Sequence, residues 1–152
     1  MLLILAALAT AHAEPLPYKS ARGVETHLTP RWAFEGGSLS ADQMNTLIAE
    51  LKASELRFDT SRFVGSRVRI YLAMPPVVKG LRGLNGLRVE WATRGQFQSG
   101  SVSPGARTLI FEGLATTREL TETFDFTLLI DARQKQGTLG FDPRFEIEVV
   151  GK

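Results

Sequence analysis

The sequence predicts an antiparallel β-sandwich, immunoglobulin-like or jelly-roll-like, that carries one short amphipathic helix. Several short stretches after residue 66 alternate apolar and polar residues, which is typical of strands with one buried face. Turns that contain glycine and proline separate these stretches. Strand and helix patterns do not alternate along the chain, which argues against a parallel sheet.

Residues 1–13 are typical of a cleavable secretory signal peptide. Leu2–Ala9 is an uninterrupted apolar run, and Ala11–Ala13 follows it as a small-residue cleavage site. The run is too short to span a bilayer, which takes about 20 residues. We therefore expect cleavage after Ala13, a mature protein without a transmembrane segment, and a periplasmic or extracellular location. The alternative is that these residues form an apolar helix of the domain.

The next residues are expected to form an irregular segment and then the helix. Residues 14–39 contain three prolines and the pair Gly36-Gly37, which favour an irregular segment. Ser40 and Gln43 have the spacing of a capping box, which predicts a helix over residues 41–53. The apolar residues that follow the box recur at the i, i+3, i+4 and i+7 positions of one helical face, and they are Met44, Leu47, Ile48 and Leu51. Residues 40–152 are expected to form a single sandwich domain that includes this helix.

The remaining pattern predicts strands, for a total of six to eight. Apolar residues at every second position place one side of each strand in the core. Pro143 interrupts the last alternating stretch, which predicts a strand at a sheet edge or a bulge. A further strand is expected at Thr108–Glu112, after the turn at 103–105. The expected inward residues are Val68, Ile70, Leu72 and Met74; Leu87, Val89 and Trp91; Phe124, Phe126, Leu128 and Ile130; and Leu139, Phe141, Phe145, Ile147 and Val149.

The composition excludes much of catalytic chemistry. The chain has no cysteine, so it has neither disulfides nor thiolate nucleophiles nor Cys-based metal sites. Of the two histidines, His12 lies in the expected leader and His27 lies in the irregular segment. The sequence contains no G-x-S-x-G motif. Phosphate-binding and dinucleotide-binding glycine motifs are also missing. We therefore expect a non-enzymatic protein with no catalytic residues, no cofactor and no resident metal.

Carboxylates leave two alternatives open. Five acids fall on the polar sides of the last two strands, where they would form a patch for calcium, although no calcium-binding loop motif is present. A hydrolase that uses paired carboxylates or His27 is the other alternative. The five acids are Asp125, Asp131, Asp142, Glu146 and Glu148.

Charge is distributed unevenly along the chain, although the net charge is only +2. Residues 57–107 hold nine basic residues against Asp59 and Glu90, whereas residues 108–152 hold five basic residues against eight acids. This basic middle segment either pairs with the acidic C-terminal strands, binds an anionic surface or glycan, or meets the acidic face of another copy. Nucleic acid is disfavoured by the expected export and the modest charge. The candidate partner-binding residues are Arg67, Arg69, Tyr71, Arg88 and Arg94.

These observations favour a protein that works through its surface. We expect an exported subunit that acts by binding or assembly in a bacterial cell envelope, through a protein partner or self-assembly, of the pilus-like or secretion-associated kind. The alternatives are the small hydrolase and a periplasmic carrier that holds a sugar or lipid between the two sheets.

Overall fold

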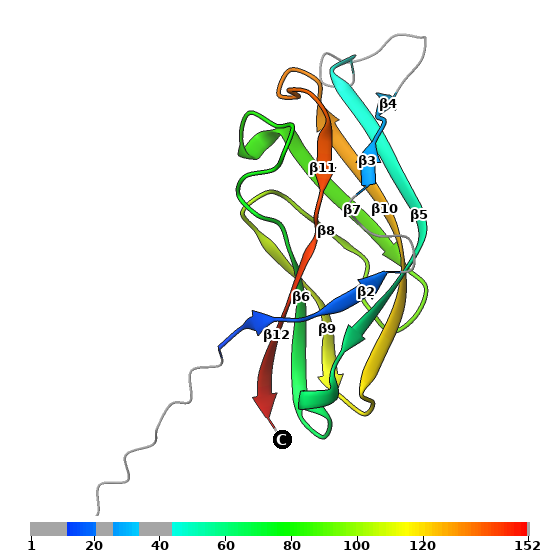
Figure 1. The fold of residues 1–152 in the computed structure, drawn as a ribbon, viewed down its shortest axis with the longest axis vertical. Coiled ribbons are helices and arrows are strands. Elements are labelled where there is room, and N and C mark those ends of the chain that lie inside the picture. The colour runs from blue at the N-terminus through cyan, green and yellow to red at the C-terminus, as the bar shows by residue number, and fades with distance from the viewer. Residues whose placement is uncertain (1–11, 21–25, 34–43, 152) are drawn as a thin grey trace, which may run out of the picture.

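The computed structural model describes residues 12–20, 26–33 and 44–151, which form an elongated sandwich of antiparallel sheets (Figure 1). The first sheet has the spatial order β1 (Glu14–Pro15), β12 (Arg144–Gly151), β6 (Arg67–Ala73) and β9 (Arg107–Leu114). The second has the order β2 (Tyr18–Ser20), β5 (Thr46–Asp59), β10 (Glu119–Asp131), β7 (Leu87–Thr93) and β8 (Gly100–Val102), and β4 (Arg31–Trp32) also pairs with β5. A separate pair joins β11 (Leu139–Phe141) and β3 (Thr26–Leu28), and two short 3₁₀ helices span Ser61–Phe63 and Leu84–Gly86.

The core lies between the two sheets, as the period-two alternation predicts. The inward residues expected for β6, β7 and β10 are buried, and so are those of β11 and β12 up to Ile147. Val149 is the exception, with 39% of its surface exposed near the end of β12. Phenylalanines fill the centre, where Phe58 contacts Phe145 edge to face with ring centroids 4.8 Å apart. The predicted fold class is therefore confirmed.

The helix expected over residues 41–53 is wrong from Thr46 onwards, because β5 runs through Thr46–Asp59. Residues 41–43 and the capping-box residue Ser40 lie outside the described part of the chain. Residues 46–59 form a strand instead of a helix because β10 pairs with β5 along its whole length, and β2 and β4 pair with the other edge of β5. Such tertiary pairing overrides the local helical pattern.

A β-bulge in β5 explains why its sequence does not alternate throughout. The register against β10 shifts between Leu51 and Ser54, and Ala53 has a positive φ of 52°. Ala49 is buried before the bulge, whereas Leu56 and Phe58 are buried after it. The inward side therefore moves from odd-numbered to even-numbered residues, as expected when a bulge inserts one residue.

In its described residues, the segment expected to be irregular contains four short strands, and the first two of them join the two layers. Along the chain, β1 pairs with β12, β2 with β5, β3 with β11 and β4 again with β5. Leu16, between the first two strands, is 3% exposed, and the Tyr18 ring packs edge to face on Phe145 at 4.9 Å. The N-terminal segment thus closes one open side of the sandwich.

Two loops pack together at one end of the molecule, and we call them the loop end: residues 75–86, between β6 and β7, and residues 132–138, between β10 and β11. The backbone N–H of Arg82 donates to the carbonyl of Gln134 at 2.9 Å, and that of Gln136 donates to Gly80 at 2.7 Å. Pro143, expected at an edge or bulge, lies in the break between β11 and β12.

Candidate functional site

The five candidate partner-binding residues do not form one site. Arg67, Arg69 and Tyr71 lie on β6 in the first sheet. Arg88 lies on β7 in the second sheet, and Arg94 directly follows that strand. The structure thus divides them between the two layers of the sandwich.

The arginines of β6 are paired within the molecule. Glu112, on the neighbouring strand β9, lies 3.2 Å from Nε of Arg69 and 3.7 Å from a guanidinium nitrogen of Arg67. The hydrogen bond from Arg69 is the main reason why the pKa of Glu112 is lowered, and the same bond raises the pKa of Arg69. These two cations already have an anionic partner.

Tyr71 belongs to a second polar cluster on the same sheet. Its hydroxyl donates to Glu148 at 2.6 Å, and Glu148 is only 8% exposed. The guanidinium of Arg107 lies 4.2 Å from the centroid of the Tyr71 ring and donates to Glu146 at 3.1 Å. Burial, followed by the bond to Glu148, raises the pKa of Tyr71. The Tyr71 hydroxyl and ring are therefore both engaged inside the molecule.

The two arginines of the second sheet are paired as well. Arg88 contacts Glu90 at 3.1 Å, and Arg94 donates to both oxygens of Asp125 at 3.2 Å. The backbone N–H of Ala53 also donates to Asp125 and is the main cause of its lowered pKa. Of the three hypotheses for the basic middle segment, the contacts with Glu112, Asp125 and Glu146 support pairing with the C-terminal strands. A partner contact at the five residues stays a prediction.

The acids considered for calcium are likewise divided. Asp125 and Asp131 belong to β10 in the second sheet, whereas Glu146 and Glu148 belong to β12 in the first. Within the described residues, no group of three or more His, Cys, Asp or Glu side chains has an arrangement that would hold a metal ion. His27 lies in β3, opposite Gly140.

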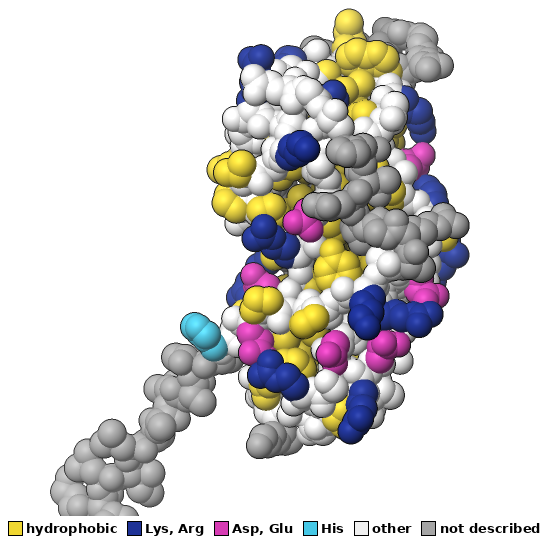
Figure 2. Space-filling view, in the orientation of Figure 1, with side chains coloured by type: hydrophobic (Ala, Val, Ile, Leu, Met, Phe, Trp, Pro, Cys, Tyr) yellow, Lys and Arg dark blue, Asp and Glu magenta, His cyan; other side chains and the backbone are white. Residues whose placement is uncertain are grey.

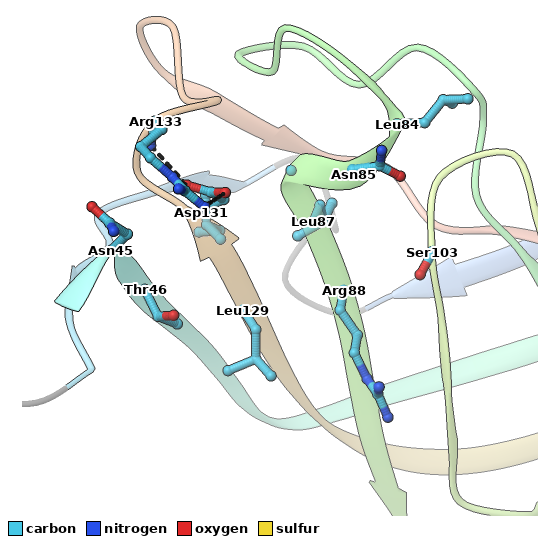
Figure 3. Close-up of a pocket in the computed structure, with 12 residues that line it drawn as sticks. Asn45, Thr46, Leu84, Asn85, Leu87, Arg88, Ser103, Leu129, Asp131 and Arg133 are labelled. Carbon is cyan, nitrogen blue, oxygen red and sulfur yellow. Dashed lines mark hydrogen bonds and ion pairs between the residues drawn. The ribbon is translucent and has the colours of Figure 1, made fainter. Parts of the chain in front are cut away.

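A cavity of about 360 Å³ lies beside Arg88 (Figure 3). Its walls come from the start of β5, the end of β10, the start of β7 and the loop end. Asp131 is its one carboxylate, and the Arg133 side chain donates to both oxygens of Asp131, at 3.0 and 2.8 Å. Figure 3 shows Arg133 folded back on Asp131, with Arg88 extending along β7. The lining residues are Asn45, Thr46, Leu84, Asn85, Gly86, Leu87, Arg88, Ser103, Leu129, Ile130, Asp131 and Arg133.

This cavity is suited to binding rather than to acid–base chemistry. The bonds from Arg133 lower the pKa of Asp131, which makes its carboxylate a weaker base. Amide, hydroxyl and leucine side chains complete the walls, and such a mixture holds a ligand through hydrogen bonds and apolar contacts. The cavity lies on the outside of the second sheet, whereas phenylalanine side chains occupy the space between the layers.

The loop end carries features that sequence reasoning missed. Val77 and Leu84 are exposed to 82% and 51%, and Lys79, Arg82 and Lys135 lie in the same two loops. The available signal was that residues 75–86 and 132–138 contain no acid. In Figure 2, basic side chains predominate in the upper part of the view, and most of the acidic side chains lie lower.

Comparison with models of known protein families, with curated proteins and with solved structures yields no match. In the part of the chain that the structure describes, no helix has the length and apolar character needed to cross a membrane.

Proposed function

We propose that this chain is an exported, non-enzymatic β-sandwich protein that acts by binding in the bacterial cell envelope. We further propose that the loop end, together with the adjoining cavity, is its binding surface. The observation that carries this proposal is the contrast between the loop end and the sheet faces. The five candidate residues on the sheet faces are engaged in internal contacts, whereas the loop end combines exposed aliphatic residues with cations in loops that contain no acid.

The position of the first strand supports export. β1 begins at Glu14, the residue that directly follows the expected cleavage site. The buried core begins at Leu16, so every described core residue lies after that site. Cleavage after Ala13 would therefore leave the described sandwich complete.

Fractionation of a bacterial host that expresses the full chain tests this proposal. We expect the mature protein to begin at Glu14 and to sediment with the envelope. We expect the double variant Val77→Asp/Leu84→Asp to be released from the envelope, because it replaces the exposed aliphatic residues by charge. Leu114→Asp is the matched control, since Leu114 is 52% exposed and Leu84 is 51% exposed. A retained leader in the cytosolic fraction, or equal envelope association of all variants, would refute the proposal.

A further inference from the structure

We propose that the loop end docks onto the surface of an anionic phospholipid bilayer. This inference rests on the proposed function, because it names the partner of the same binding surface. It follows from three properties of the loop end: its order, its exposed aliphatic residues, and three cations that have no ion pair among the described residues.

The loop end is a preformed platform. Besides the two hydrogen bonds between the loops given above, the N–H of Gly140 donates to the carbonyl of Lys79 at 3.0 Å. Val78 is 7% exposed and belongs to the core, and Leu81 packs against the core. These anchors hold the neighbouring side chains in place, so binding would require little ordering of the chain.

Exposed aliphatic residues gather at one place on this platform. A Cβ built on Gly105 would lie 3.7 Å from both Leu84 and Pro76, so these two side chains flank the same turn. Val77, the neighbour of Pro76, is the most exposed of the large hydrophobic residues described, at 82%. The free energy falls when such residues move from water to the boundary between lipid headgroups and acyl chains.

The loop end also contains three cations besides Arg133, whose side chain is bonded to Asp131. Among the described residues, none of Lys79, Arg82 and Lys135 has an ion pair within 4.0 Å, although Lys135 donates to the carbonyl of Gly137 at 2.6 Å. This differs from Arg67 and Arg69, which share Glu112. Lysine and arginine near an anionic leaflet are attracted to it over about one Debye length.

The shape of the patch favours a bilayer over an acidic protein. A specific protein interface buries about 800 Å² on each partner, which is more than Pro76, Val77 and Leu84 supply. Pro76 and Val77 are exposed in the loop that follows β6, and Leu84 is exposed at the rim of the cavity that it lines. A fluid headgroup layer adapts to a projecting tip and surrounds its cations with phosphate.

Sedimentation of the full chain with phospholipid vesicles tests this inference. We expect binding to mixed phosphatidylglycerol–phosphatidylcholine vesicles, weaker binding in high salt, and little binding to pure phosphatidylcholine. Lys79→Gln/Arg82→Gln is expected to lower the partition coefficient about 25-fold, since each lost cation costs about fivefold near an anionic leaflet. Val77→Asp is expected to lower it at least about tenfold through the lost burial of an aliphatic side chain.

Two matched controls separate this mechanism from general effects of charge and hydrophobicity. Leu114→Asp removes an exposed leucine far from the loop end along the sandwich, and Arg118→Gln removes a cation that also lacks an ion pair within 4.0 Å among the described residues. Both are expected to bind as the original chain does. Equal binding to neutral and anionic vesicles, equal losses in the controls, or stronger binding to a soluble acidic protein than to vesicles would overturn the inference. If vesicle binding fails while the fractionation still depends on Val77 and Leu84, the proposed function stands and only the bilayer is excluded.

Discussion

Replacing the buried Glu122 by Gln is expected to lower the free energy of unfolding by about 2–3 kcal/mol. Glu122 is 3% exposed, and its carboxylate accepts four backbone N–H groups. Oε1 accepts from Arg94 at 3.2 Å, Gly95 at 2.9 Å and Thr123 at 2.8 Å, and Oε2 accepts from Phe97 at 3.0 Å. The side chain thus holds the connection that follows β7.

The magnitude follows from these four contacts. A glutamine oxygen can keep the three donors at Oε1, but its amide nitrogen would then face the N–H of Phe97. One buried donor without an acceptor costs about 1–3 kcal/mol. The three remaining bonds weaken because they lose the charge of the acceptor.

Urea unfolding followed by tryptophan fluorescence measures this loss, because Trp91 is 4% exposed in the folded protein. With a denaturant slope of about 1–3 kcal/mol per molar urea, the midpoint should fall by roughly 1 M. Glu119→Gln is the control, since it makes the same chemical change at an exposed position of the same strand. A midpoint for Glu122→Gln no lower than that of Glu119→Gln would refute the reasoning.

Three further predictions concern the backbone, pH and the paired arginines. Gly65→Ala is expected to lower the free energy of unfolding by about 1–2 kcal/mol through its positive φ alone, because a Cβ there meets nothing within 4 Å. Gly80→Ala is expected to lower it by about 3 kcal/mol or more, because its Cβ would lie 2.5 Å from a backbone carbonyl oxygen. Equal urea midpoints for the two variants would contradict this. Burial raises the pKa of Tyr18 from 10.0 to about 12, so the phenol ionises at a lower pH in the unfolded chain than in the folded protein. The free energy of unfolding should therefore fall as pH rises from 10 towards 12. Tyr18→Phe should show a shallower fall in the same titration. Arg67→Glu/Arg69→Glu is expected to leave vesicle binding unchanged, and a loss as large as that of the loop-end variants would place the docking surface on β6 instead.

The sequence predicted the sandwich well where one side of a strand is apolar and the other polar. β6, β7 and β10 have this pattern, and their buried residues are the expected ones. The pattern failed in β5 for two reasons. Ile48, on the outward side, lies opposite Leu129 and is itself half-buried. The bulge at Ala53 also moves the inward side from odd-numbered to even-numbered residues. Apolar residues on both sides of a bulged strand thus produced the spacing of a helix.

The candidate site could be predicted only in part. The excess of basic residues in the middle of the chain is visible in the sequence, but the acid that each arginine meets depends on strand order. Arg69 meets Glu112 because β9 lies beside β6, and Arg94 meets Asp125 because β10 lies beside β7. The loop end was missed because Val77 and Leu84 lie outside any periodic stretch, so their exposure follows from loop packing.

The pairing of β1 with β12 has a consequence for how the protein acquires its structure. The first sheet contains both the earliest and the latest of the described strands, so β1 has no partner until β12 has left the ribosome. Such sequence-distant pairing slows folding, so the first sheet cannot be completed before the last of the described strands has been synthesised. Under the export proposed above, the first sheet would therefore be completed only after the C-terminal strand has crossed the membrane.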